Sequence, residues 1–304
     1  MVGDQPLDEM VHAILVAIGR RIQVPVDDAR LLRLHSNAIF ALPSAGLLVR
    51  IATNPDAFAG VQAAVAVTRW LAGRGFPCVV PADIGEQPLV ERDRVVSIWR
   101  YVPTPPGPPA TGSDLGRLLR VLHAQPWPPH PLGQLSDPFD SVANAIIGTP
   151  RAMSDAHRSW LSDRIIELRE LWSAMDFPHP RGLIHGDAHP NNLMRTLSGG
   201  IVLGDWDHVA VGPREWDLVQ IHYTRRRFGR PSEEDIEGFT RAYGWDIRGW
   251  PGLDTLIAVR EITGLSPYIR TARTRAFACL ELAHRLDILQ HQDTLARWTS
   301  PPPE

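Results

Sequence analysis

The sequence predicts an α+β fold with two lobes, a small β-rich N-terminal lobe and a larger helical C-terminal lobe. Three observations support this. Strand-like apolar segments concentrate before residue 102, and most later segments have helical spacing. Between them, "PTPPGPP" at 103–109 cannot be helix or central strand, because proline lacks an N–H donor and fixes φ. We therefore place the lobes at 1–102 and 103–304. With 304 residues, 44% of them hydrophobic, the chain is long enough to bury a core in each.

The first elements of the N-terminal lobe are predicted as a helix followed by a hairpin. Apolar residues recur with helical spacing over 7–20. The segment 31–52 is typical of two short strands around a turn. The turn formers in it are Pro43, Ser44 and Gly46.

A second helix and a second strand pair complete this lobe. Asn54 is the expected N-cap of the helix, with Pro55 at its first position, and Gly73 and Gly75 end it. The strand pair is predicted at 78–81 and 95–102.

The C-terminal lobe is predicted to be mostly helical. Ser113 is the expected N-cap of its first helix, and Ser232 with Asp235 forms a capping-box pattern. Two strand-like pieces, "NLMR" and "GIVLGD", interrupt the helices within 183–205. The predicted helices are 113–124, 154–175, 214–227, 232–243, 253–264 and 268–291.

Composition narrows the classes of function. The net charge of −3 is not the strongly positive charge typical of a nucleic-acid-binding protein. No apolar run is long enough to cross a membrane. Cys78 and Cys279 lie far apart with no C-x-x-C pair, which excludes a zinc site built on cysteine. A reduced cytoplasmic protein is the simplest interpretation, and the oligomeric state stays open.

The stretch "LIHGDAHPNN" at 183–192 contains most of the candidate catalytic and metal-binding residues. His185, Asp187 and Asn192 fit the pattern H-x-D-x-x-x-x-N, and Asp205 follows at the end of the apolar run "IVLGD". Phosphoryl transfer needs a carboxylate to accept the proton of the attacking hydroxyl. It also needs an amide oxygen and a second carboxylate to hold Mg²⁺ against the phosphates of ATP. We expect Asp187 in the first role, Asn192 and Asp205 in the second, and His185 to orient the loop.

Other interpretations of this stretch stay open. Asp, Asn, Pro and His all favour turns, so an ordinary surface loop is the simplest alternative. The D-x-H pair of Asp187 and His189 also occurs in metal-dependent phosphoesterases, but these need further His and Asp ligands, and no second cluster is visible.

"HGDAHPNNLM" and "IVLGDWDHVAVGPREWDL" resemble the catalytic and metal loops of the aminoglycoside phosphotransferase and choline kinase-like superfamily. The resemblance runs from about residue 30 to the end of the chain and is strongest over 182–218. It implies a bilobal protein-kinase-like fold, with Asp187 as catalytic base and Asn192 and Asp205 as Mg²⁺ ligands. It also implies a supporting role for Asp207, which matches a position that is often acidic in the family.

The same resemblance implies a nucleotide site and an acceptor. The segment 97–102 would be the hinge strand, where the backbone of Trp99, Arg100 and Tyr101 meets the adenine. ATP is the expected cofactor, with GTP not excluded, and the acceptor is a small-molecule hydroxyl. Aminoglycosides, amino sugars and amino alcohols are candidates, and several of these are cationic.

The N-terminal lobe departs from the kinase pattern. All 31 basic residues are arginine, and Arg50 in "GLLVRIA" stands where a kinase lysine grips the phosphates. Uncharged residues occupy 62–64, near the expected partner glutamate. Arginine can still bind phosphate bidentately, so we expect a phosphate contact. There is no G-x-G-x-x-G, and we expect Ser36 and Asn37 to cover the phosphates instead.

The missing lysine–glutamate pair also motivates an alternative function, a pseudokinase that binds nucleotide without useful chemistry. A further alternative concerns Glu215 and Asp217, together with the acids over 233–237. These residues fit two interpretations equally, a surface that attracts a cationic substrate or acids favoured by a helix start.

Overall fold

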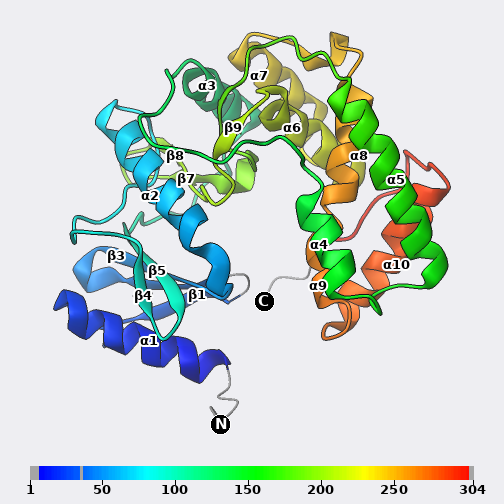
Figure 1. The fold of residues 1–304 in the computed structure, drawn as a ribbon. Coiled ribbons are helices and arrows are strands. Elements are labelled where there is room, and N and C mark those ends of the chain that lie inside the picture. The colour runs from blue at the N-terminus through cyan, green and yellow to red at the C-terminus, as the bar shows by residue number, and fades with distance from the viewer. Residues whose placement is uncertain (1–6, 35–36, 301–304) are drawn as a thin grey trace.

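The N-terminal lobe is built on a five-stranded antiparallel sheet with the order β1-β2-β3-β5-β4 (Figure 1). The computed structural model describes residues 7–34 and 37–300. The strands are β1 Arg30–Leu34, β2 Asn37–Leu42, β3 Leu47–Ala52, β4 Leu89–Glu91 and β5 Arg94–Arg100. The predicted hairpin corresponds to β2 and β3, which a short 3-10 turn and Gly46 at φ 64° connect. The segment 31–52 thus holds three strands where two were expected.

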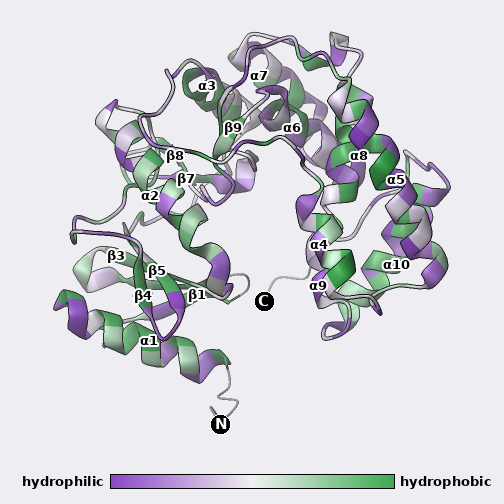
Figure 2. Ribbon diagram, in the orientation of Figure 1, coloured by the Kyte–Doolittle hydropathy of each residue, from purple (hydrophilic) through white to green (hydrophobic). Residues whose placement is uncertain are grey.

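Helices cover both faces of this sheet. On α1 (Leu7–Ile22), Val11, Ile14 and Ile18 are buried at helical spacing against the sheet, and Figure 2 shows apolar and polar residues alternating around it. The other face packs on α2 (Phe58–Gly73), which follows a 3-10 turn capped by Asn54. Along β5, successive side chains enter one core and then the other, because the side chains of a strand alternate between its faces.

The C-terminal lobe is helical apart from two small hairpins. Its helices are α3 Gly112–His123, α4 Asp140–Gly148, α5 Asp155–Ser173, α6 Glu215–Phe228, α7 Glu233–Tyr243, α8 Leu253–Thr263, α9 Ser266–Thr271 and α10 Ala276–Gln290. Helices α4, α5, α8, α9 and α10 gather on the side away from the N-terminal lobe (Figure 1). The hairpins pair β6 (Gly182–Ile184) with β9 (Ala210–Gly212), and β7 (Leu193–Arg195) with β8 (Ile201–Leu203).

Three further element predictions were wrong in detail. Residues 78–81 form only single bridges, Cys78 with Leu203 and Pro81 with Trp99, since proline cannot donate to a ladder. Thr111, not Ser113, caps α3, in a capping box with Asp114. The predicted helix 268–291 is two helices, α9 and α10. The break between them contains neither glycine nor proline, so local propensity gave no signal for it.

The two lobes share a core. One buried cluster contains Val95 and Trp99 from β5 and also Leu115 and Leu119 from α3. The boundary at 102/103 therefore stays a prediction. Over 7–34 and 37–300, no helix is both long and apolar enough to cross a membrane.

Candidate active site

The two hairpins bring two polar loops together. Loop 185–192 connects β6 to β7, and loop 204–209 connects β8 to β9. Because β6 pairs with β9 and β7 with β8, the loops face each other. Gly186 makes this possible: its φ is +87°, and a Cβ there would lie 2.1 Å from the carbonyl oxygen of His208.

His185 ties the loops together from behind. It is fully buried, and its Nε2 lies 2.8 Å from the carbonyl oxygen of Gly204, while the Asp187 backbone N–H donates to its Nδ1 at 3.3 Å. These bonds fit a neutral ring protonated at Nε2, and burial lowers the pKa of His185 accordingly. The ring of Trp206 packs edge-on against it at 4.7 Å, between centroids. His185 thus positions the backbone next to both Asp187 and Asp205.

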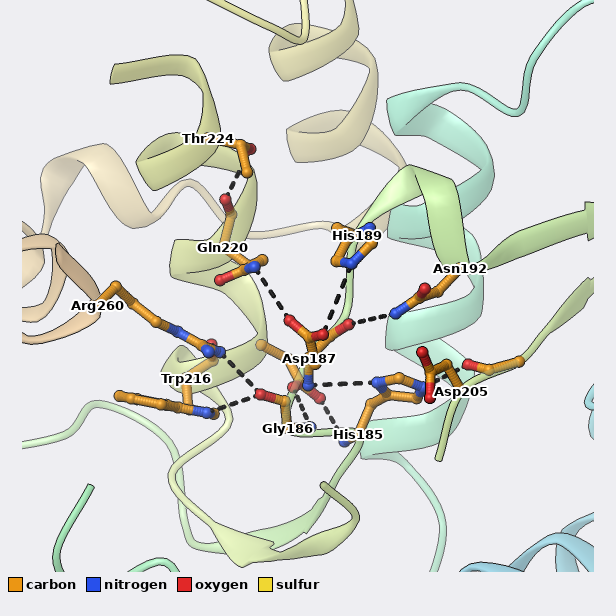
Figure 3. A network of polar contacts seen from close by, with 12 residues as sticks. His185, Gly186, Asp187, His189, Asn192, Asp205, Trp216, Gln220, Thr224 and Arg260 are labelled. Atoms are coloured by element: carbon orange, nitrogen blue, oxygen red, sulfur yellow. Dashed lines mark hydrogen bonds and ion pairs between the residues drawn. The ribbon is translucent and has the colours of Figure 1, made fainter. Parts of the chain in front are cut away.

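Asp187 lies at the centre of the network of polar contacts (Figure 3). Gln220 Nε2 donates to its Oδ1 at 3.1 Å, and His189 Nε2 lies 3.6 Å from its Oδ2. About a third of the side chain, 34%, is exposed. Burial alone raises the pKa of Asp187, but His189 and the charge of Arg260 lower it more, so the net shift is downward. The carboxylate is therefore ionised, oriented and accessible, as a proton acceptor requires.

Asn192 and Asp205 carry the two further oxygen-bearing side chains of the facing loops (Figure 3). Asn192 Nδ2 donates to the Asp187 carbonyl oxygen at 2.9 Å, which leaves its amide oxygen outside this bond. Asp205 has the left-handed φ of 59°, rare for a non-glycine residue, and its side chain is 38% exposed. An amide oxygen and a carboxylate are the ligands that Mg²⁺ prefers, so these residues fit the ion.

The N-terminal lobe reaches this site through β2 and β3. Arg50 forms an ion pair with Asp207, and its Nη2 lies 3.5 Å from Asp205 Oδ1. Asn37 Nδ2 lies 3.4 Å from Asp207 Oδ2. Arg50 and Asn37 are thus at the loop that carries Asp205, where we expected phosphate contacts. Ser36 lies outside the described residues.

The predicted hinge segment is largely engaged in contacts within the N-terminal lobe. Trp99 is buried, and its indole N–H donates to Ser97 Oγ at 2.9 Å. The backbone N–H of Arg100 donates to Val80 O at 2.8 Å, and that of Tyr101 donates to Gly46 O at 2.9 Å. The N–H groups of Arg100 and Tyr101 are therefore already used, and an adenine here would need other backbone groups of the segment.

A support that the sequence did not reveal lies beneath loop 185–192. Asp217 on α6 is fully buried and accepts the backbone N–H groups of His185 at 2.7 Å and of Gly186 at 2.8 Å. Arg260 on α8 donates to the Gly186 carbonyl oxygen at 3.1 Å, and so does the Trp216 indole at 3.0 Å. The apolar spacing of α6 and α8 marks their buried faces but gives no sign of these polar contacts.

The burial of the acids on α6 bears on whether they form a surface that attracts a cationic substrate. Glu215 and Asp217 have no exposed surface, and Glu215 accepts from His179. They are structural and cannot attract a substrate. The phosphoesterase alternative gains no support, because residues 7–34 and 37–300 contain no group of three or more His, Cys, Asp or Glu side chains placed to hold a metal.

The fold is a kinase-like scaffold, and its two polar loops bring the carboxylates of Asp187 and Asp205 and the amide of Asn192 to one site that Arg50 of the smaller lobe reaches. The model of the phosphotransferase enzyme family matches residues 31–256. The chain therefore belongs to this family.

Solved structures show the same fold at low identity. Amicoumacin kinase hAmiN, in complex with AMP-PNP, Ca²⁺ and Ami, has a TM-score of 0.70 at 13% identity, over 96% of this chain and 98% of its own. A choline/ethanolamine kinase family protein from Mesorhizobium loti has a TM-score of 0.64 at 16% identity, over 95% and 97%. Aminoglycoside phosphotransferase APH(4)-Ia has a TM-score of 0.66 at 15% identity, over 93% and 99%.

A curated relative matches over a short segment. A probable serine/threonine-protein kinase of Saccharomyces cerevisiae is 38% identical over 51 residues, which are 17% of this chain and 14% of the yeast protein.

Proposed function

We propose that this protein transfers the γ-phosphoryl group of ATP to a hydroxyl group of a small molecule. The observation that carries the proposal is the Asp187 carboxylate, which is ionised, exposed on one side and held by Gln220 and His189. Asn192 Nδ2 bonds to the backbone carbonyl oxygen of Asp187, and Asp205 lies on the facing loop 204–209. This combination supplies a proton acceptor beside a cation site, as phosphoryl transfer requires.

The mechanism follows from these positions. Asp187 accepts the proton of the attacking hydroxyl and orients that oxygen toward the phosphorus. Asn192 and Asp205 would hold Mg²⁺, which when bound offsets negative charge on the phosphates. Arg50 donates to phosphate oxygens from the N-terminal lobe. His185 keeps the backbone of both loops in register and does not itself touch the substrate.

The acceptor is proposed by class. The family and the structural neighbours support a hydroxyl on an amine-bearing small molecule: the neighbours' names specify amicoumacin, choline or ethanolamine, and aminoglycosides. Two structures in the same group contain ADP with spectinomycin and GDP with kanamycin, so GTP belongs beside ATP in the test.

The test is acceptor-dependent release of ADP or GDP in the presence of Mg²⁺. The acceptor panel contains aminoglycosides, amino sugars, amino alcohols and macrolides, and Asp187→Asn is the control. We expect one acceptor class to stimulate release at least about a hundredfold above the variant, since a general base contributes about 10²–10⁴ in rate. Stimulated release that survives in Asp187→Asn would refute the role of the base. ATP binding without release for any acceptor would favour the pseudokinase alternative.

A further inference from the structure

The cation of the N-terminal lobe is held by a carboxylate of the opposite lobe. Arg50 on β3 forms an ion pair with Asp207, and only 12% of its side chain is exposed. Asn37 Nδ2, from the neighbouring strand, lies 3.4 Å from the same carboxylate. Two N-terminal strands therefore converge on Asp207.

Helix α2 cannot supply this carboxylate. Its sequence, FAGVQAAVAVTRWLAG, contains no acidic residue. The helix nevertheless begins next to the same loop, because a Cβ built on Gly60 would lie 3.9 Å from the Asp207 carbonyl oxygen. In this chain the carboxylate that pairs with Arg50 is Asp207 of loop 204–209. The adjacent helix α2 has no carboxylate to offer.

We propose that Asp207 is the positioning residue for Arg50, replacing the carboxylate that α2 lacks. This inference rests on the proposed function, since the phosphates in question are those of ATP. A guanidinium has five N–H donors in a planar fork, so a carboxylate can hold part of the fork while other donors face a phosphate. A side chain fixed in advance loses less conformational entropy when the nucleotide binds.

An arginine suits this contact. The contact spans the two lobes and must fix an orientation as well as a charge. A lysine ammonium is a point charge on a flexible stem, whereas the guanidinium fork keeps its orientation when one edge is bound. Asp207 thereby couples the position of β3 to the loop that carries Asp205.

The experiment is a double-mutant cycle on ATP binding. The dissociation constant of ATP is measured for the wild type, Arg50→Ala, Asp207→Asn and the double variant, each with Mg²⁺ and with EDTA. We expect Asp207→Asn to weaken binding about tenfold under both conditions, in line with the coupling of residues in contact. In the Arg50→Ala background it should have no further effect. Asp155→Asn, which breaks the exposed pair with Arg158, is the matched control and should leave binding unchanged.

Three results would overturn the inference. Weakening only with Mg²⁺ would make Asp207 a metal ligand. Equal weakening in the Arg50→Ala background would show that Asp207 acts independently of Arg50. If Asp207→Asn and Asp207→Ser are folded, as thermal unfolding would check, and both bind ATP with wild-type affinity, Asp207 has no role in positioning Arg50. A wild type that bound no ATP would instead refute the proposed function.

Discussion

Asp217 accepts the backbone N–H of His185 at 2.7 Å, and its carboxylate is fully buried. The same carboxylate accepts the N–H of Gly186 at 2.8 Å and lies 3.1 Å from His123 Nε2. Tyr243 OH lies 3.0 Å from the other nitrogen of that ring. Helices α3, α6 and α7 thus converge on one carboxylate, which holds the loop that presents Asp187.

Asp217→Asn tests this support. The amide keeps the shape but turns an N–H group toward donors, which leaves buried polar groups unpaired. We expect the free energy of unfolding to fall by about 3 kcal/mol and kcat to fall about tenfold or more. Chemical denaturation and steady-state rates measure the two effects. Asp163→Asn, at an exposed position on α5, should stay within about 0.5 kcal/mol of wild type. A destabilisation as small as that of this control would contradict the assigned role.

Gly186→Ala tests the close approach of the two loops. Gly199 is the matched control, because its φ of +82° imposes the same backbone strain while nothing lies within 4 Å of its Cβ position. We expect Gly199→Ala to cost about 1–2 kcal/mol from the left-handed backbone alone. Gly186→Ala should cost clearly more and lower kcat about a hundredfold, because the loops must separate. Equal effects of the two variants on stability and rate would argue against the contact with His208.

His189→Gln tests what lowers the pKa of Asp187. A lowered pKa keeps the Asp187 carboxylate ionised as pH falls. The apparent pKa of the acid limb in the kcat/KM profile should therefore lie below the range usual for aspartate. Replacing His189 removes a charge near Asp187 Oδ2 that lowers the pKa of Asp187, so the acid limb should move to higher pH. The measurement is kcat/KM against pH. His291→Gln, at a side chain 73% exposed, is the control and should keep the wild-type profile.

Gln220→Leu tests how the base is oriented. The variant removes the N–H donor to Asp187 Oδ1 from a buried position without a large change in volume. We expect kcat to fall about tenfold while the ATP dissociation constant stays unchanged, because Gln220 contacts the base. Gln220→Glu should lower kcat further at low pH, because a second carboxylate raises the pKa of Asp187. A change in ATP affinity with unaltered kcat would place Gln220 in a different role.

Local patterns were enough to predict which candidate site residues share one loop. His185, Asp187 and Asn192 belong to one short loop, and a phosphoryl-transfer site needs a carboxylate and an amide at such a spacing. The capping box of Ser232 and Asp235 was confirmed for the same reason, because a cap is made by residues three positions apart. The hairpin of β2 and β3 likewise followed from its turn residues.

The supports of the site could not be predicted in this way. Asp217, Arg260 and Asp207 act on residues far away in the sequence, and nothing in their local pattern says which segment they will face. A buried carboxylate or guanidinium needs partners, and only the packing of helices and lobes supplies them. The sequence by itself therefore determined the candidate catalytic loop and the order of a β-rich part followed by a helical part. The tertiary structure decided which distant side chains hold that loop, and that Asp207 rather than α2 faces Arg50, because hydrogen bonds between distant segments form only once the fold brings them together.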